Sequence, residues 1–81
     1  MNDIKGTVKS YILQEFLPGE NPNELTDSVP LITGGVLDSL ATLRLVSFLE
    51  EKYDIQLQAH ETGIDYLNTL DDIAALVESK L

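Results

Sequence analysis

The spacing of apolar side chains predicts a helix over residues 4–16. Along this stretch the apolar residues return at every fourth position, with one aromatic residue beside them: Ile4, Val8, Ile12, Phe16 and Tyr11. This period matches one face of a helix and not the two-residue period of a strand. Asp3 precedes the stretch as a candidate N-cap, and Pro18-Gly19 is typical of a helix end.

Residues 18–37 show no periodic pattern, which predicts a long loop. Prolines and glycines interrupt it repeatedly: Pro18, Gly19, Pro22, Pro30, Gly34 and Gly35. Connections longer than about 12–15 residues are uncommon in compact domains and tend to be functional or disordered. Apolar residues are nevertheless scattered through this one: Leu25, Val29, Leu31 and Ile32. We therefore expect the loop to lie across the core and not to extend into water.

A second helix is predicted over residues 39–53, and it carries two apolar surfaces. At about 100° per residue, one arc gathers a core face made of Leu45, Val46, Leu49 and Tyr53, with Thr42 among them. Leu40 and Leu43 lie outside that arc, on the side that carries Arg44, Ser47, Glu50 and Glu51. Two interpretations stay open for these two leucines: contact with the long loop or a short following helix, or contact with a partner protein.

The last third of the chain predicts a helical turn and a third main helix. Residues 55–57 are strand-like, and residues 63–67 suit one helical turn or less. Thr69, followed by Asp72, resembles a capping box at the start of the last helix. The core stripe of that helix is Leu70, Ile73, Ala74, Val77 and Leu81. We therefore predict one all-α domain over residues 1–81, a small bundle of three main helices plus one short helix, with the long loop between the first two.

Charge and composition narrow the function classes. The 81 residues include 14 Asp and Glu against 5 Lys and Arg, a net charge of −9, while 43% are hydrophobic. Such a chain repels nucleic-acid phosphates and anionic lipid, so we expect neither as a partner and expect basic patches on other proteins instead. The apolar fraction is that of a folded domain and not of a disordered acidic tail. With no basic leader and no spanning apolar run, we expect a soluble, cytoplasmic monomer.

Few residues are available for catalysis. The chain has no cysteine, which excludes disulfides, cysteine-zinc sites and a cysteine nucleophile. Its single histidine, His60, lies in a polar connection and is predicted to be a solvated surface residue, so we expect no metal site. Adjacent helix positions point about 100° apart, so the pairs Glu50-Glu51 and Asp71-Asp72 are predicted to be solvated and not to form acid–base dyads. We expect no catalytic residues and no self-sufficient enzyme.

The junction between the long loop and the second helix is the remaining candidate. Asp38 is a candidate N-cap and Ser39 opens the helix, which on its own describes an ordinary helix start. Gly34 and Gly35, just upstream, keep bulk away from it. The N–H groups and the dipole of a helix N-terminus favour a negative phosphate. Ser39 is therefore a suitable place to attach a phosphodiester.

The segment around this junction resembles a known attachment region. Residues 37–53, LDSLATLRLVSFLEEKY, are similar to the phosphopantetheine attachment region of the acyl and peptidyl carrier protein superfamily, and the similarity extends over nearly the whole chain. The resemblance implies that a separate phosphopantetheinyl transferase, using coenzyme A, attaches 4′-phosphopantetheine to Ser39, with Asp38 as part of the motif. The arm would import the thiol that the chain lacks, and catalysis would stay with partner enzymes.

Two departures from the family pattern point to a specialised carrier. Carriers of fatty-acid synthesis typically have acidic residues two and five positions after the serine, where this chain has Ala41 and Arg44. A positive charge there would repel the basic docking patches of those partners. The run GGVLDSL resembles discrete carriers that work with standalone adenylating enzymes, D-alanyl and other aminoacyl carriers among them. The expected partner face is Leu40, Leu43, Arg44, Ser47, Glu50 and Glu51.

The resemblance leaves the cargo open. Our first expectation is a freestanding acyl carrier protein of a specialised fatty acid, polyketide or secondary-metabolite pathway. The alternative is an aminoacyl or peptidyl carrier that a standalone adenylating enzyme loads. In either case the implied partners are the transferase, an acyl- or aminoacyl-activating ligase, and downstream transferases or synthases. A remote alternative is a helical adaptor that is never modified, in which Ser39 only opens the helix.

Overall fold

The computed structural model describes residues 3–19 and 21–81, and its regular structure there is entirely helical. The helices are α1 (Ile4–Phe16), α2 (Ser39–Tyr53), α3 (Ile64–Leu67) and α4 (Leu70–Lys80), with short 3₁₀ turns η1 (Pro22–Glu24) and η2 (Ala59–Glu61). The predicted bundle of three main helices and one short helix is confirmed. None of the described helices is long and apolar enough to cross a bilayer.

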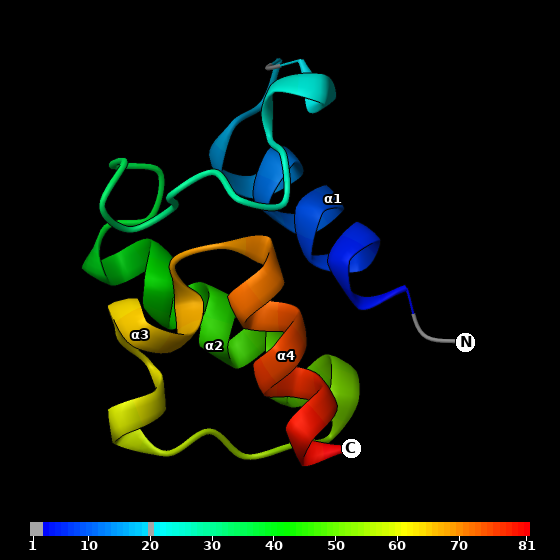
Figure 1. Cartoon of the computed structure of the whole chain (residues 1–81), viewed down its shortest axis with the longest axis vertical. Coiled ribbons are helices and arrows are strands. Elements are labelled where there is room, and N and C mark those ends of the chain that lie inside the picture. Colours follow the sequence, from blue (N-terminus) through cyan, green and yellow to red (C-terminus); the bar gives the residue numbers. More distant parts are fainter. Residues whose placement is uncertain (1–2, 20) are drawn as a thin grey trace.

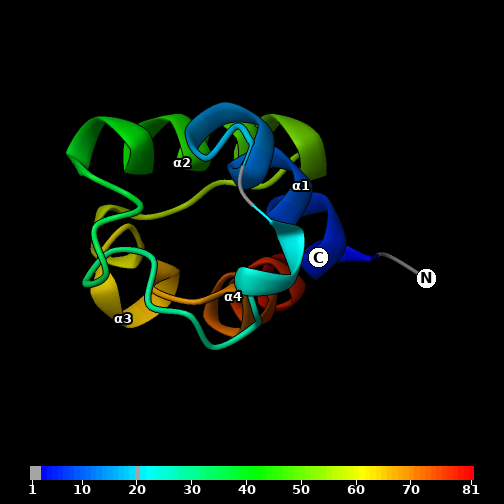
Figure 2. The same ribbon diagram turned by 90° about the horizontal axis from the view of Figure 1, so that it is seen from above.

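The helices surround one core (Figure 1). Figure 2 shows α2 and α4 on opposite sides of the view, with α3 at one end and α1 towards the other. α4 packs against both α1 and α3. The long loop between α1 and α2 passes over the top of the bundle in Figure 1, and its Leu25 and Leu31 are buried. The prediction of a loop that lies across the core is therefore confirmed.

The strand-like interpretation of residues 55–57 is wrong. This segment is extended, but no second extended segment pairs with it in the described chain. Its backbone is satisfied from a helix instead, because the Leu57 N–H donates to Glu50 Oε2 at 3.0 Å. The half-buried side chains of Ile55 and Leu57 pack against the core. The alternation of apolar and polar residues at 55–57 therefore reflects a connecting segment with one side against the core, and not a strand of a sheet.

The core faces of the helices match the predictions with two corrections. On α2 the buried line is Ala41, Leu45 and Leu49, while the other members of the predicted core face, Val46, Tyr53 and Thr42, are only half-buried. The buried face of α2 is thus rotated away from Thr42 and towards Phe48, whose ring stacks on an aromatic side chain of α1. On α4 Leu76 joins the buried stripe, whereas Leu81 is 61% exposed because it lies beyond the last helical turn.

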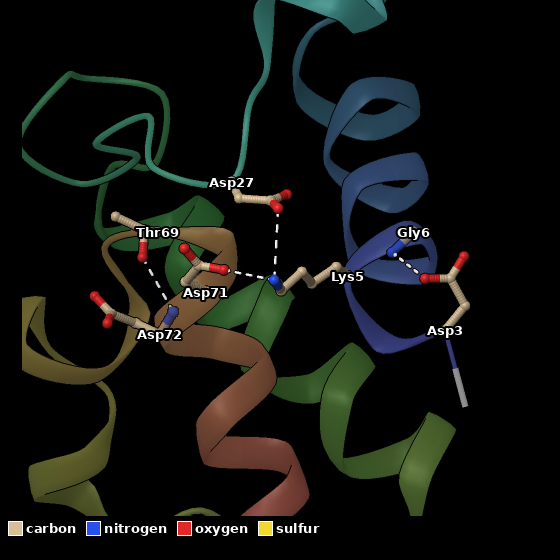
Figure 3. Close-up of polar contacts among 7 residues, drawn as sticks. All are labelled: Asp3, Lys5, Gly6, Asp27, Thr69, Asp71 and Asp72. Carbon is tan, nitrogen blue, oxygen red and sulfur yellow. Dashed lines mark hydrogen bonds and ion pairs between the residues drawn. The ribbon is translucent and has the colours of Figure 1, made fainter. Parts of the chain in front are cut away.

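The predicted N-caps of α1 and α4 are confirmed (Figure 3). Asp3 Oδ1 accepts a hydrogen bond from the Gly6 N–H at 3.1 Å, and Thr69 Oγ1 accepts one from the Asp72 N–H at 3.0 Å. Each bond satisfies one of the amide groups that a helix start leaves without an intrahelical acceptor. Local sequence alone therefore determined where these two helices begin.

Lys5 links α1 to the long loop and to α4. Its Nζ lies 2.6 Å from Asp71 Oδ1 and 3.5 Å from Asp27 Oδ2 (Figure 3). These carboxylates, Asp71 first, raise the pKa of Lys5. The Asp71 N–H also donates to the Asp27 carbonyl oxygen at 3.2 Å. Asp71, predicted to be free in solvent, is thus exposed but paired, and the cluster fixes where the loop meets α4.

A second ion pair holds the segment between α2 and α3. Glu61 Oε1 lies 2.7 Å from Lys80 Nζ and accepts a hydrogen bond from the Gln58 N–H at 2.8 Å. The Lys80 ammonium, followed by the Gln58 amide, lowers the pKa of the Glu61 carboxyl below its ordinary value. The η2 turn is thereby tied to the end of α4.

Glu61→Gln should lower the thermal unfolding temperature in a pH-dependent way. Because the folded-state pKa of Glu61 is lowered, its stabilisation is complete above the unfolded-state pKa of about 4.3 and is lost as the pH falls through the folded-state value. The difference in unfolding temperature between wild type and variant should therefore shrink on acidification. Glu78→Gln, at an exposed α4 carboxylate, is the control and should show no such trend. A difference that is independent of pH would contradict the assignment.

Candidate functional site

Ser39 is the first residue of α2, and its side chain is exposed. Asp38 caps the helix as predicted, since its Oδ1 accepts a hydrogen bond from the Ala41 N–H at 2.7 Å. The Asp38 carbonyl oxygen also accepts bonds from the Thr42 N–H at 2.9 Å and from the Thr42 hydroxyl at 2.7 Å. The start of α2 is therefore well ordered, and Ser39 projects from a rigid position.

Two amide groups at this helix start remain available. Within residues 3–19 and 21–81, the Ser39 and Leu40 N–H groups donate no hydrogen bond. A 15-residue helix such as α2 adds a positive end to its dipole at this point. A phosphodiester carried by Ser39 would meet both features, so the residues present fit a negatively charged group at this hydroxyl.

The loop that leads into the site, residues 31–37, needs both of its glycines. A Cβ on Gly34 would clash with the carbonyl oxygen of Pro30. Gly35 has φ of 86°, a left-handed conformation that strains other residues. The glycine pair thus does more than keep bulk away from Ser39, because it allows the chain to turn tightly just before the cap.

An open groove of about 590 Å³ runs beside Ser39. One wall consists of Ile32 and Leu37 from the loop with Thr42 and Leu43 from α2, and the other of Thr62, Gly63 and Ile64 at the start of α3. The lining is mostly apolar, and Asp38 and Ser39 contribute to it. No atom lies within 4 Å of a Cβ placed on Gly63, so this wall leaves space. A slender flexible chain attached at Ser39 could lie along such a groove.

The two apolar residues that the sequence left ambiguous are exposed. Leu40 and Leu43 are each 62% exposed, so neither is covered by the loop or by α3. Ile64, at the start of α3, is 53% exposed and lines the groove opposite Leu43. Ile64 was absent from the predicted partner face, because its exposure depends on how a four-residue helix is oriented. Leu43 and Ile64 line the groove together with Ser39, while Leu40 is exposed on α2 outside it.

The polar residues of the predicted partner face differ in their surroundings. Arg44, Ser47 and Glu51 are exposed, and Arg44 forms no ion pair with any residue the structure describes. Glu50 is half-buried and accepts the Leu57 N–H, so it was wrong to regard this carboxylate as fully solvated. Ala41 is buried, so the position two residues after Ser39 offers no side chain to a partner.

An aromatic pair supports α2 behind Arg44. The Tyr11 ring stacks on Phe48 with a centroid separation of 4.0 Å, and the Tyr11 hydroxyl donates to the Arg44 carbonyl oxygen at 3.3 Å. Burial raises the pKa of Tyr11, which keeps its phenol protonated as a donor. This pair explains why the buried face of α2 is shifted from the predicted arc.

The remaining candidates carry no site in the described part of the chain. His60 is exposed, as predicted, and its ring meets the Tyr66 ring edge-on at 6.1 Å. No cluster of three or more potential metal ligands occurs among the described residues. Among the described residues, the start of α2 with its groove is thus the strongest candidate site.

Comparison with known proteins identifies relatives of the same size. No protein-family model matches the chain. Three curated relatives are each named D-alanyl carrier protein, and each alignment spans 71 residues, which is 88% of this chain and 86% of the relative. The identities are 37% for the protein from Streptococcus sanguinis, 34% for that from Streptococcus suis and 35% for that from Streptococcus gordonii.

Proposed function

The chain belongs to the acyl and peptidyl carrier protein superfamily, and from this premise we propose that it carries D-alanine as a thioester on a 4′-phosphopantetheine arm attached to Ser39. The observation that carries the proposal is the exposed Ser39 hydroxyl at a rigid helix start beside an open groove. The names of the relatives favour aminoacyl cargo, the alternative in our sequence analysis, over the fatty acyl or polyketide cargo expected first.

Ser39 supplies the hydroxyl for attachment. Its Oγ–P bond forms as the pyrophosphate linkage of coenzyme A breaks, adenosine 3′,5′-bisphosphate leaves, and the serine proton passes to a base of the transferase. The chain's one histidine lies elsewhere, and the neighbouring Asp38 carboxylate is engaged as the cap of α2. Once attached, the arm supplies a thiol that holds the cargo as a thioester.

The residues around Ser39 would hold the arm and present it. Asp38 fixes the helix start, while the N–H groups of Ser39 and Leu40 and the helix dipole favour the phosphate charge. The groove walls would guide the arm along Leu43 and Ile64. The exposed Leu40 and Leu43 would give a partner enzyme apolar contacts near the point where the arm is attached.

Two successive reactions test the proposal. Incubation with coenzyme A and a broad-specificity phosphopantetheinyl transferase should add the mass of one phosphopantetheine, and a failure to do so excludes a carrier role. A standalone D-alanine-adenylating enzyme with ATP should then add one D-alanyl group that hydroxylamine removes. L-alanine and a fatty acid with its own ligase serve as competing cargoes. Loading by the fatty acid alone would retain the carrier role and reject the cargo.

Arg44→Glu should improve binding to enzymes of fatty-acid synthesis at low salt. The substitution restores a negative charge on the exposed side of α2, and an exposed charge pair is worth about 1 kcal/mol at most, roughly a fivefold change in KM. The gain should disappear at high salt because the charges are screened. Lys52→Glu makes the same charge change at the far end of α2 and should have little effect. Equal gains from both variants would assign the effect to net charge and not to Arg44.

A further inference from the structure

Asn68 connects α3 to the loop that precedes the Ser39 site. It is half-buried at the end of α3, and its Oδ1 accepts hydrogen bonds from the Ile32 N–H at 2.9 Å and the Thr33 N–H at 3.1 Å. Its backbone carbonyl oxygen accepts a further bond from the Leu31 N–H. One residue therefore satisfies three successive amide groups of the loop.

The loop held by Asn68 is closed on itself. The Leu37 N–H donates to the Leu31 carbonyl oxygen at 2.8 Å, and the Gly35 N–H donates to that of Ile32 at 3.2 Å. Leu31 and Leu37, at its two ends, are buried. Residues 31–37 form a closed unit that leads directly into Asp38, the cap of α2. A shift of this unit would therefore move Ser39.

Asn68 also joins the two walls of the groove. Ile32, whose amide it holds, belongs to the loop wall, while Ile64 belongs to the α3 wall. Asn68 directly follows Leu67, the buried residue that anchors α3. The contacts between Asn68 and the loop therefore set the distance between a four-residue helix and the loop opposite it.

We infer that Asn68 is a positioning residue, which holds the loop wall against α3 and so presents Ser39 and its groove in one arrangement to the transferase. This inference rests on the proposed function. The essential element is the side-chain oxygen, which accepts two amide protons. Without it, the Ile32 and Thr33 N–H groups lose their acceptor, and of the three amide bonds to Asn68 only the Leu31 bond to its backbone still ties the loop wall to α3.

Three substitutions separate positioning from general stability. Asn68→Ala removes the acceptor. Asn68→Asp keeps a carboxylate oxygen at the same place and should act as the rescuing variant. Asn68→Gln keeps the amide but moves its oxygen outward by one methylene, so it should lose the same two hydrogen bonds as Asn68→Ala. It provides the test if the alanine variant folds poorly. Thr33→Val is the control, since it removes only the neighbouring hydroxyl, which contacts Asn68 at 3.4–3.5 Å.

Two measurements on the full chain test the inference. Amide hydrogen exchange, measured by NMR before any modification, should accelerate about tenfold or more at Ile32 and Thr33 in the alanine and glutamine variants, with α4 amides unchanged. In the transferase reaction the KM for the same variants should rise roughly fivefold, with kcat within about twofold of wild type. The aspartate and Thr33→Val variants should match wild type in both measurements.

The outcomes distinguish this inference from the proposed function. If wild type is not modified at Ser39, the carrier role fails, whatever the exchange data show. If wild type is modified and the Asn68→Gln variant keeps the wild-type exchange and KM, the positioning role is wrong. An Asn68→Asp variant as defective as Asn68→Ala would also overturn it, because the acceptor oxygen would then not be the essential element.

Discussion

Ser39→Ala should abolish the gain of one phosphopantetheine completely while leaving the fold intact. The substitution removes the hydroxyl oxygen that forms the bond to phosphorus, and no other group can replace it at the helix start. The side chain is exposed and Asp38, not Ser39, caps the helix, so the free energy of unfolding should change by no more than about 0.5 kcal/mol. Intact mass measurement and thermal unfolding give the two readouts.

Ser47→Ala is the matched control for this experiment. Ser47 is also an exposed serine on α2, so the two variants lose the same hydroxyl group, but Ser47 lies in the middle of the helix, away from the cap and the groove. The Ser47→Ala variant should gain one phosphopantetheine as wild type does. Modification that persists in the Ser39→Ala variant would place the attachment elsewhere, and peptide mass mapping would find it.

Alanine substitutions of buried and exposed leucines on α2 should lower the free energy of unfolding by very different amounts. Leu45→Ala should destabilise the protein by about 2–5 kcal/mol, because a fully buried leucine leaves a cavity. That is a large share of the roughly 5–15 kcal/mol that holds a domain together. The double variant Leu40→Ala with Leu43→Ala should lose less than about 1 kcal/mol, because both side chains are largely exposed. Urea unfolding measures these differences.

The double variant should instead reduce turnover by partner enzymes. The two leucines provide the largest exposed apolar surface next to Ser39 on α2, and such contacts form the centre of transient interfaces. Turnover by the adenylating enzyme should fall about tenfold or more. A loss of several kcal/mol in stability would mean that these leucines belong to the core in solution. Unchanged turnover would mean that partners do not use this face.

Much of the fold was predictable because its signals are local. The α1 and α2 bounds, the caps at Asp38 and Thr69, and the short turn at α3 all follow from residues within one helical turn of each boundary. Ser39 as the candidate site was predictable for the same reason, since the cap, the helix start and the two glycines are contiguous. The carrier resemblance rests on the same contiguous run.

The parts that could not be predicted depend on residues distant in sequence. The Leu57 N–H in the segment 55–57 donates to Glu50, and the Ile32 N–H in the long loop donates to Asn68. Neither hydrogen bond has a signal in the sequence. The orientation of α2 is set by the stacking of Tyr11 on Phe48, which buries Ala41 and leaves Thr42 half-exposed. This contact joins side chains of α1 and α2, so no local stretch of the sequence signals the rotation.

The sequence by itself determined the helices, their caps and the serine that ends the loop, because hydrophobic periodicity and helix-end chemistry act over a few residues. Tertiary structure alone decided that Leu40 and Leu43 stay exposed and that a groove opens between Leu43 and the start of α3. Exposure is a property of what else packs nearby, and the groove is lined by two stretches that are far apart in the chain, residues 32–43 and 62–64. Their arrangement follows from Asn68, from Leu67 and from the core beneath them, which no single stretch of sequence encodes.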